Sequence, residues 1–180
     1  MDNTFVSCLA HDIKCENIFP LLQNNYQFAI TEDVVSEGVK RFNEIVEQIH
    51  QNVKVFSFDD KCKEINSYLM KRYPGLDLGE STTIVASIMM TRSGFENYII
   101  TDDYGARNTI PKLHENLQLE ELLGFPVVPI RYTGTAGFLI HMKKNRKIAA
   151  DLCVKISKDF RSGSFRLPSA LIDELGEPAI

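Results

Sequence analysis

The sequence lacks any apolar run of the ~18 residues that a membrane-spanning helix needs. Its first residues, MDNTFVSCLAHDIKCENIF, carry acids and polar groups where a secretory signal peptide has a basic segment and then an apolar one. Internal repeats, low-complexity tracts and proline- or glycine-rich linkers are also missing. Because a chain of 180 residues is long enough for one large core, we expect a single domain over residues 1–180, cytoplasmic and not bound to a membrane.

Paired metal-binding motifs are missing as well. The four cysteines contain no CxxC pair, and the four histidines show no ligand spacing, so a zinc site is not expected. The thiols are expected to be reduced and buried or half-buried: Cys8, Cys15, Cys62 and Cys153. The TGTAG segment at 133–137 lacks the lysine of a phosphate-binding loop, and its glycines indicate a tight turn from a strand into a helix.

The chain as a whole has no excess of positive charge, since its formal net charge is −4. Between Arg131 and Arg166, however, nine basic residues stand against two acidic ones. An acidic body beside a basic C-terminal third is typical of a protein that holds cations in one place and a polyanion in another. A solvated basic helix face gives the same pattern, so charge alone leaves both interpretations open.

Short apolar stretches alternate along the chain with longer amphipathic ones. Strands are predicted for YQFAI (26–30), VKVFSF (53–58), NYIIT (97–101) and PVVPIRY (126–132). Helical patterns are found at 34–49, 59–75, 79–94, 135–145, 146–160 and 167–176. Strands that alternate with helices of this length predict an α/β fold with a mainly parallel sheet.

Carboxylates lie near the expected carboxyl ends of these strands. Glu37 and Glu80 lie near the beginning of their helices, and Asp102 and Asp103 directly follow NYIIT. Because such ends share one edge of a parallel sheet, the carboxylates are expected to converge. Converging carboxylates need a proton or a cation, and an all-oxygen set selects Mg²⁺ or Mn²⁺, ions that activate water against phosphodiesters. For Glu37 and Glu80 taken singly, complementation of the helix dipole remains an alternative explanation.

Five short motifs follow one another in a fixed order. They are Asp2-Asn3-Thr4, Val34-Val35-Ser36-Glu37, Leu78-Gly79-Glu80-Ser81, Ile100-Thr101-Asp102-Asp103 with Ala106-Arg107, and Thr133-Gly134-Thr135-Ala136-Gly137. Their order resembles that of the PIN-domain family, in particular the toxin-like branch described as nucleic-acid-binding proteins. The resemblance covers nearly the whole chain, and DDxxAR followed by xGTxG is its most specific part.

The resemblance implies a three-layer α/β/α sandwich around a mainly parallel sheet, with a Mg²⁺- or Mn²⁺-dependent endoribonuclease site. It places the catalytic acids at Asp2, Glu37, Glu80 and Asp103, and the metal ligands at Asp2, Glu80, Asp102 and Asp103. In the family an apolar strand leads into the first aspartate, whereas only Met1 precedes Asp2. We therefore expect a first strand that is short or missing, or a translation start upstream of Met1.

Other residues are expected to support the site. Thr135 resembles the family's small hydroxyl residue, which holds a carboxylate or a phosphate oxygen. Arg107 lies at i+4 from Asp103, where it can pair with a carboxylate or take a phosphate. RNA-backbone contacts or plain solvation are both open for the basic residues of a later helix: Lys143, Lys144, Arg146 and Lys147.

The resemblance also implies partners. RNA is the expected substrate, a small antitoxin protein the expected regulator of a toxin–antitoxin pair, and a second copy of the chain a partner in a homodimer. The alternative function is that of a catalytically inactive PIN-fold module that binds RNA or a protein.

Overall fold

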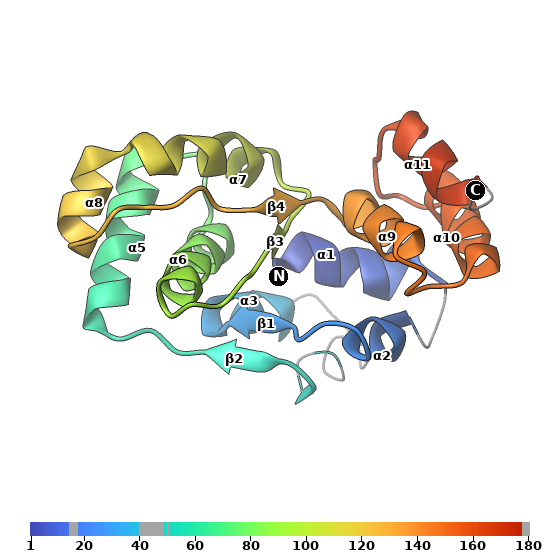
Figure 1. Cartoon of the computed structure of the whole chain (residues 1–180), viewed down its shortest axis with the longest axis horizontal. Helices are drawn as coiled ribbons and strands as arrows, with labels where there is room; N and C mark the ends of the chain where they lie inside the picture. The colour runs from blue at the N-terminus through green and yellow to red at the C-terminus, as the bar shows by residue number, and fades with distance from the viewer. Residues whose placement is uncertain (15–17, 40–48, 50, 178–180) are drawn as a thin grey trace.

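The structure, a computed structural model, describes residues 1–14, 18–39, 49 and 51–177 (Figure 1). It is a mixed α/β fold whose strands are β1 (Ala29–Thr31), β2 (Lys54–Phe56), β3 (Ile99–Ile100) and β4 (Tyr132–Thr133). The helices before β2 are α1 (Asn3–Ser7), the π-helical turn η1 (Cys8–Asp12), α2 (Ile18–Gln23) and α3 (Glu32–Val39). Between β2 and β4 lie α5 (Asp60–Arg72), α6 (Leu78–Arg92), α7 (Tyr104–Thr109), the 3₁₀ turn η2 (Ile110–Glu115) and α8 (Leu117–Leu123). The last helices are α9 (Thr135–Lys144), α10 (Ala150–Ser162) and α11 (Ser169–Gly176).

The strands form two short parallel pairs. β1 pairs with β2, with Ala29 opposite Lys54, and β3 pairs with β4, with Ile99 opposite Tyr132. Parallel pairing of strands that alternate with helices confirms the predicted fold class in its coarse form. In the described part of the chain the two pairs are not joined into one central sheet, so the expected three-layer sandwich is not seen as such.

The boundaries of the elements follow local chemistry. Asp59 begins α5 by accepting a hydrogen bond from the backbone nitrogen of Cys62 (2.8 Å), as expected for an acidic helix start. The strand predicted at 126–132 is wrong except at its last residue, because Pro126 and Pro129 have no N–H to donate to a ladder. Part of the helix expected at 34–49 is α3, whereas residues 40–48 lie outside the described residues.

The hydrophobic core has two parts, and β3 contributes to both. Ile99 packs in a cluster with residues of α5, α6 and α8, and Ile100 packs in a second cluster with residues of α1, α9 and α10. Adjacent strand residues point to opposite faces, which explains why neighbours enter different clusters. Figure 1 shows the corresponding ends of the molecule, with α5 and α8 at one and α10 and α11 at the other. Cys15 lies outside the described residues. The other three of the four cysteines are free and buried, as predicted: Cys8, Cys62 and Cys153.

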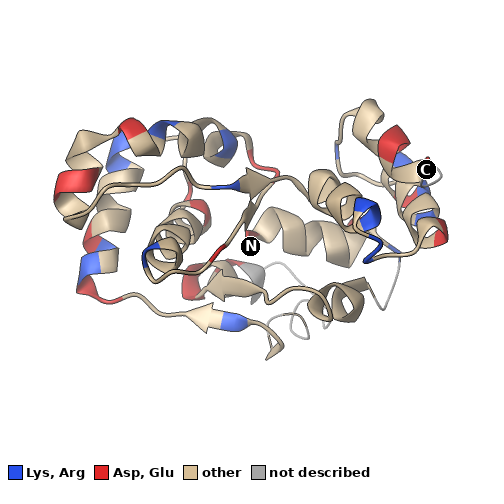
Figure 2. Cartoon of the chain, in the orientation of Figure 1, with Lys and Arg blue, Asp and Glu red and all other residues tan. Residues whose placement is uncertain are grey.

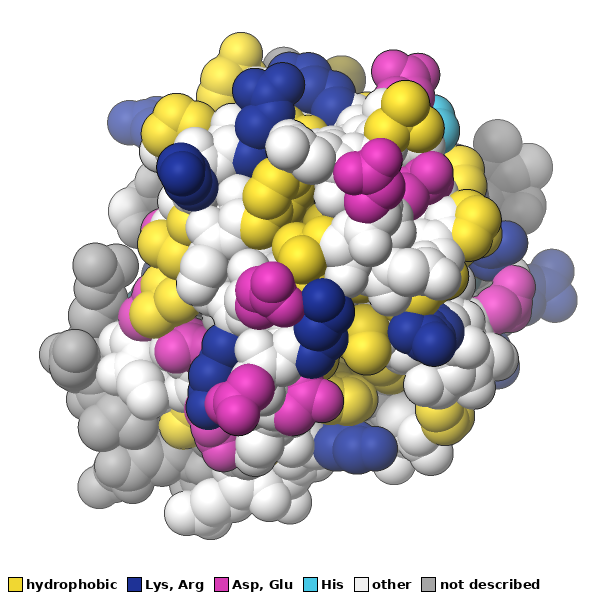
Figure 3. Space-filling view, turned by 90° about the vertical axis from the view of Figure 1, so that its left-hand side faces the viewer, with side chains coloured by type: hydrophobic (Ala, Val, Ile, Leu, Met, Phe, Trp, Pro, Cys, Tyr) yellow, Lys and Arg dark blue, Asp and Glu magenta, His cyan; other side chains and the backbone are white. Residues whose placement is uncertain are grey.

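Charges of both signs are interspersed over the surface. Along α5, Lys61 pairs with Glu64 (3.0 Å) and Lys63 with Asp60 (3.4 Å). Figure 3 shows basic and acidic side chains next to one another on this end of the molecule, with apolar side chains scattered among them. No helix within the described residues has both the length and the apolar character required to span a bilayer.

Candidate acidic site

Asp2 is anchored at the carboxyl end of β3. Its carboxyl group is nearly inaccessible, with the residue only 3% exposed. One carboxyl oxygen accepts from the hydroxyls of Thr101 (2.8 Å) and Thr4 (2.9 Å), and the other from the backbone nitrogen of Asn3 (2.7 Å). The backbone nitrogen of Asp2 donates to the carbonyl of Ile100 (3.2 Å), which fixes the start of α1 against β3. Burial raises the pKa of Asp2, although these hydrogen bonds oppose the rise.

Glu80 and Asp77 form a capping box at the start of α6. The Asp77 carboxylate accepts from the backbone nitrogen of Glu80 (2.8 Å), and the Glu80 carboxyl accepts from the backbone nitrogen of Asp77 (3.0 Å). Glu80 is 5% exposed and also lies against the carboxyl of Asp103. Burial and the hydrogen bond to Asp103 raise the pKa of Glu80 to about 8. At neutral pH Glu80 is therefore mostly protonated, and its proton lies in the hydrogen bond between the carboxyl groups of Glu80 and Asp103.

Asp103 has two tasks at once. One of its oxygens caps α7 by accepting from the backbone nitrogen of Ala106 (3.0 Å). Its backbone nitrogen donates to the same Thr101 hydroxyl that holds Asp2 (3.1 Å). Thr101 thus connects Asp2 and Asp103 from a single buried position.

Glu37 approaches the same place from α3. Its carboxylate accepts from the side-chain amide of Asn3 (2.8 Å) and lies so close to Gly79 that a Cβ there would be 2.8 Å from a carboxyl oxygen. Glycine at position 79 is therefore required for this approach. Desolvation raises the pKa of Glu37, and the charges of Asp77 and Asp2 add to the rise, whereas the Asn3 hydrogen bond lowers it.

These residues form what we call the acidic site: Asp2, Glu37, Asp77, Glu80 and Asp103. All four predicted catalytic acids lie in it. Sequence reasoning missed Asp77, which the D-x-x-E spacing of a capping box could have indicated. Within the described residues no three acidic, histidine or cysteine side chains already form a metal-binding group. One carbonyl oxygen, Oδ1 of Asn3, is buried there without a hydrogen-bond partner among the described residues.

Asp102 is turned towards α9 instead. Its carboxylate accepts from both the backbone nitrogen (2.9 Å) and the hydroxyl of Thr135 and thereby caps this helix. A Cβ at Gly134 would overlap with the same carboxylate, so glycine is required there. The predicted role of Thr135 in holding a carboxylate is confirmed for Asp102. The sequence could not distinguish the roles of Asp102 and Asp103, whereas in the structure Asp102 caps α9 and Asp103 caps α7.

Arg107 lies exposed on α7. Among the ion pairs formed by described residues none includes Arg107, so the predicted pairing with Asp103 at i+4 is not formed. A Cβ at Gly134 would lie 3.7 Å from one of its guanidinium nitrogens, which places the cation beside the loop that Asp102 caps. The side chain is therefore available for an anion.

The basic residues of α9 and of the turn after it divide into two kinds. Lys143 is 7% exposed, and its ammonium donates to the carbonyls of Glu174 (2.6 Å) and Leu175 (3.1 Å) at the end of α11. Two of the three donors of the buried Lys143 ammonium are thus used inside the protein, so this side chain is not part of a solvated basic face, and its contact with RNA stays a prediction. Lys144 pairs with the Glu174 side chain at the surface (2.7 Å), and Arg146 and Lys147 are exposed. Figure 2 shows acidic residues beside basic ones at this end of the molecule.

The Lys143→Ala variant is expected to lose about 2 kcal/mol of unfolding free energy, because two carbonyls lose a charged donor. Lys144→Ala is its matched control, and we expect a change below about 0.5 kcal/mol, since exposed ion pairs contribute little. Urea unfolding of both variants measures the difference. Equal losses would show that the Lys143 ammonium does not stabilise α11.

Comparison of the chain with protein-family models, with curated proteins and with solved structures finds no match. The functional argument therefore depends on the geometry of the acidic site.

Proposed function

We propose that the protein is a PIN-type endoribonuclease that hydrolyses RNA phosphodiester bonds with Mg²⁺ or Mn²⁺. The observation that supports this most directly is the convergence of Asp2, Glu37, Glu80 and Asp103. These acids come from four separate segments of the chain, and burial raises the pKa values of Asp2, Glu37 and Glu80. Structural capping explains Asp77 and one oxygen of Asp103, but it does not explain why Glu37 is brought here.

The donors of the acidic site suit a hard divalent cation. Its potential ligand atoms are all carboxyl oxygens. The proton on Glu80 reduces the negative charge of the site, and a bound cation would do the same in its place. When bound, such an ion neutralises charge on a phosphate and activates water. Asp2, Glu80 and Asp103 would hold it, with Glu37 as a supporting residue. Since no metal-binding group is preformed among the described residues, the carboxyl groups must reorient and Glu80 must release its proton on binding.

The fold supports the same proposal. The strand β3 ends at the acidic site, where Thr101 lies buried, and β1 leads into α3, which carries Glu37. With a further strand between them, the two parallel pairs would form the central sheet of the three-layer sandwich. Arg107, one turn after Asp103, is the nearest exposed cation in the sequence for an RNA phosphate, and Arg146 and Lys147 are further candidates.

Cleavage of a labelled mixed RNA pool by the purified chain tests the proposal. We expect cutting in Mn²⁺ and Mg²⁺, none in EDTA, and none by Asp103→Asn. Asp59→Asn is the matched control, because Asp59 also caps a helix through its Oδ1 but lies outside the acidic site. Cutting that survives in EDTA or in Asp103→Asn would refute the proposed site.

One observation favours a second function. Arg146 and Lys147 are exposed after α9, where they can hold a polyanion without any metal, as in a catalytically inactive RNA- or protein-binding module of the same fold. RNA that is retained by the chain in EDTA and left uncut in Mn²⁺ would establish this alternative. A small antitoxin and a second copy of the chain remain proposed partners of the nuclease.

A further inference from the structure

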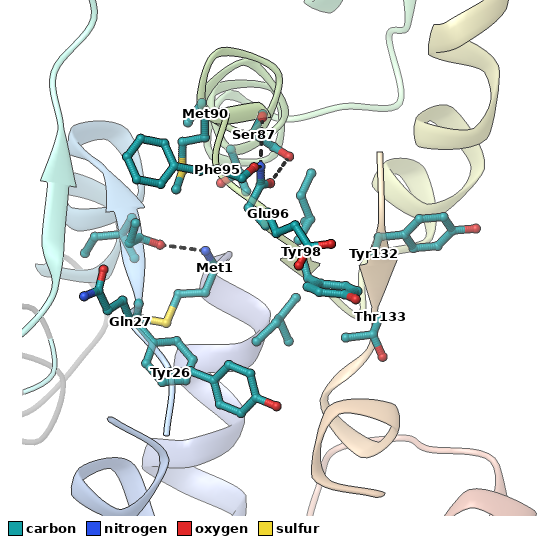
Figure 4. A pocket seen from close by; sticks show the side chains of 18 of the residues that line it. Met1, Tyr26, Gln27, Ser87, Met90, Phe95, Glu96, Tyr98, Tyr132 and Thr133 are labelled. Atoms are coloured by element: carbon teal, nitrogen blue, oxygen red, sulfur yellow. Dashed lines mark hydrogen bonds between the residues drawn. The ribbon is translucent and has the colours of Figure 1, made fainter. Parts of the chain in front are cut away.

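A cavity separates the two strand pairs. In the described part of the chain each sheet has just two strands, and a cavity of about 440 Å³ is lined by residues of β1 on one side and of β3 on the other. Figure 4 shows this cavity with Met1 at its end, Gln27 on the β1 side and Tyr98 on the β3 side. The volume lies within the range of about 300 to 1,000 Å³ over which protein pockets enclose ligands.

The edges of both strands face this cavity with main-chain groups. The carbonyl of Phe28 accepts from the main-chain nitrogen of Lys54 in β2 (3.1 Å). Because main-chain groups of successive strand residues point to opposite sides, those of Gln27 and Ala29 point towards the cavity. Ile99 bonds towards β4 through the carbonyl of Arg131 (3.0 Å), so its neighbours face the cavity as well. No hydrogen bond among the described residues uses the main-chain nitrogen or oxygen of Gln27 or of Tyr98.

Met1 lines this cavity, and Met1 and Asp2 bond to the two strands as a central strand would. The main-chain nitrogen of Met1 donates to the carbonyl of Ala29 in β1 (2.7 Å), a bond that Figure 4 shows as a dashed line. The next nitrogen, that of Asp2, donates to the carbonyl of Ile100 in β3 (3.2 Å). Consecutive N–H groups that point to opposite neighbours are the pattern of a central strand. The cavity continues the line of this pairing.

The walls of the cavity indicate an uncharged, apolar occupant. Aromatic and aliphatic side chains dominate them, and Glu96 is the one Asp, Glu, Lys or Arg among the residues that line the cavity. Phe95 and Tyr98 lie at this wall with 59% and 55% of their surface exposed.

We infer that the cavity binds an extended apolar peptide strand of a partner polypeptide, which pairs with β1 and β3 in line with Met1 and Asp2. A polypeptide fits better than another apolar ligand because it alone offers alternating N–H and C=O groups to both edges at once. Its side chains are apolar because a central strand is covered on both faces. The bound strand joins the two sheets and holds Asp2 in place. The cavity adjoins the acidic site through Asp2, but the inference does not require catalysis.

Binding of a fluorescein-labelled peptide to the full chain tests this inference. The probe has two lysines for solubility followed by about five valine, leucine and isoleucine residues, the usual strand length. We expect saturable binding by fluorescence anisotropy in EDTA. A second peptide with the same side chains but N-methylated at alternate residues cannot donate hydrogen bonds to one of the edges. We expect it to bind at least tenfold more weakly.

Variants locate the binding. Ala86→Phe fills the cavity from α6 and is expected to weaken binding at least tenfold, whereas Ala170→Phe, on the exposed face of α11, leaves it unchanged. Thermal unfolding checks that Ala86→Phe is folded. If it is not, Ala86→Val narrows the cavity at the same place with a smaller side chain, and we expect about fivefold weaker binding.

Other outcomes would overturn the inference. Equal binding of the N-methylated peptide would mean that the cavity takes apolar molecules without strand pairing. Absence of peptide binding would overturn the inference outright, and dimers by sedimentation velocity that Ala86→Phe disrupts would then assign the cavity to a second copy of the chain. None of these readouts depends on RNA cleavage, so this inference and the proposed nuclease activity can fail separately.

Discussion

The Glu80→Gln variant is expected to cleave RNA at least about 100-fold more slowly than the unsubstituted chain in Mn²⁺, the scale on which a group that stabilises transition-state charge acts. Glutamine keeps the size of the side chain and can still accept the backbone hydrogen bond from Asp77. It cannot lose a proton to become an anionic ligand. Initial rates at pH 7 to 9 measure the loss, and Glu64→Gln, at an exposed position on α5, is the matched control.

The same variant also tests whether Glu80 binds the proton, through the pH dependence of the free energy of unfolding. The pKa of Glu80 is about 8 in the folded chain against 4.5 for an unperturbed glutamate, so between these values the folded state holds a proton that the unfolded state has released. The free energy of unfolding without metal therefore falls as pH rises from about 4.5 to 8, by at most about 1.4 kcal/mol per pH unit for this proton. The stabilisation is complete below the lower value and lost above the higher one.

Urea unfolding in EDTA at several pH values measures this slope. We expect Glu80→Gln to flatten it and Glu64→Gln to leave it unchanged, because Glu64 is exposed in the folded chain. A residual slope is expected, since burial also raises the pKa of Asp2 and that of Glu37. Parallel slopes for all three proteins would show that Glu80 is not the group that binds the proton.

Elements with strong local signals were predicted correctly from the sequence. An acid at each helix start, Pro-Gly after α5 and a glycine after α6 define these two helices, and the alternation of VKVFSF defines β2. The short helix α1 was not predicted, because NTFVS has no helical period and its helix is stabilised by the burial of Phe5 and Val6. A sequence of five residues does not show which tertiary contacts will bury its side chains, so such a helix cannot be predicted from its own residues.

The candidate site shows the same division. The edge rule predicted that Glu37, Glu80, Asp102 and Asp103 approach one another, and the structure brings Glu80 against Asp103 and Glu37 against Gly79, next to Glu80 in the sequence. Asp2 was expected there only because of the resemblance to the PIN-domain family. The separation of Asp102 from Asp103 was not predicted, because it depends on which helix N-terminus each carboxylate caps. The burial of Lys143 likewise depends on α11, which packs against α9 from a distant part of the chain.

The Asp2→Ala variant is expected to lose about 3 kcal/mol of unfolding free energy, because three donors lose their acceptor in a buried place. They are the hydroxyls of Thr101 and Thr4 and the backbone nitrogen of Asn3. Asp2→Asn retains one carbonyl oxygen, and we expect a loss of about 1 kcal/mol. Urea unfolding at pH 7 in EDTA measures both, and neither variant is expected to cleave RNA.

Asp59→Ala is the matched control for the stability loss of Asp2→Ala. Asp59 also caps a helix, but it lies exposed at the start of α5, so its loss is expected to cost about 1 kcal/mol, the usual value of an N-cap. The difference between the losses of unfolding free energy in Asp2→Ala and Asp59→Ala measures how strongly the hydrogen bonds of Asp2 hold the N-terminal segment between the two strand pairs. If Asp2→Ala costs no more than Asp59→Ala, the N-terminal segment is not held there, and the acidic site lacks one of its proposed ligands in the free protein. The expected full loss in Asp2→Ala with a small one in Asp2→Asn would show that one acceptor oxygen at this position is sufficient to hold the hydroxyls of Thr101 and Thr4.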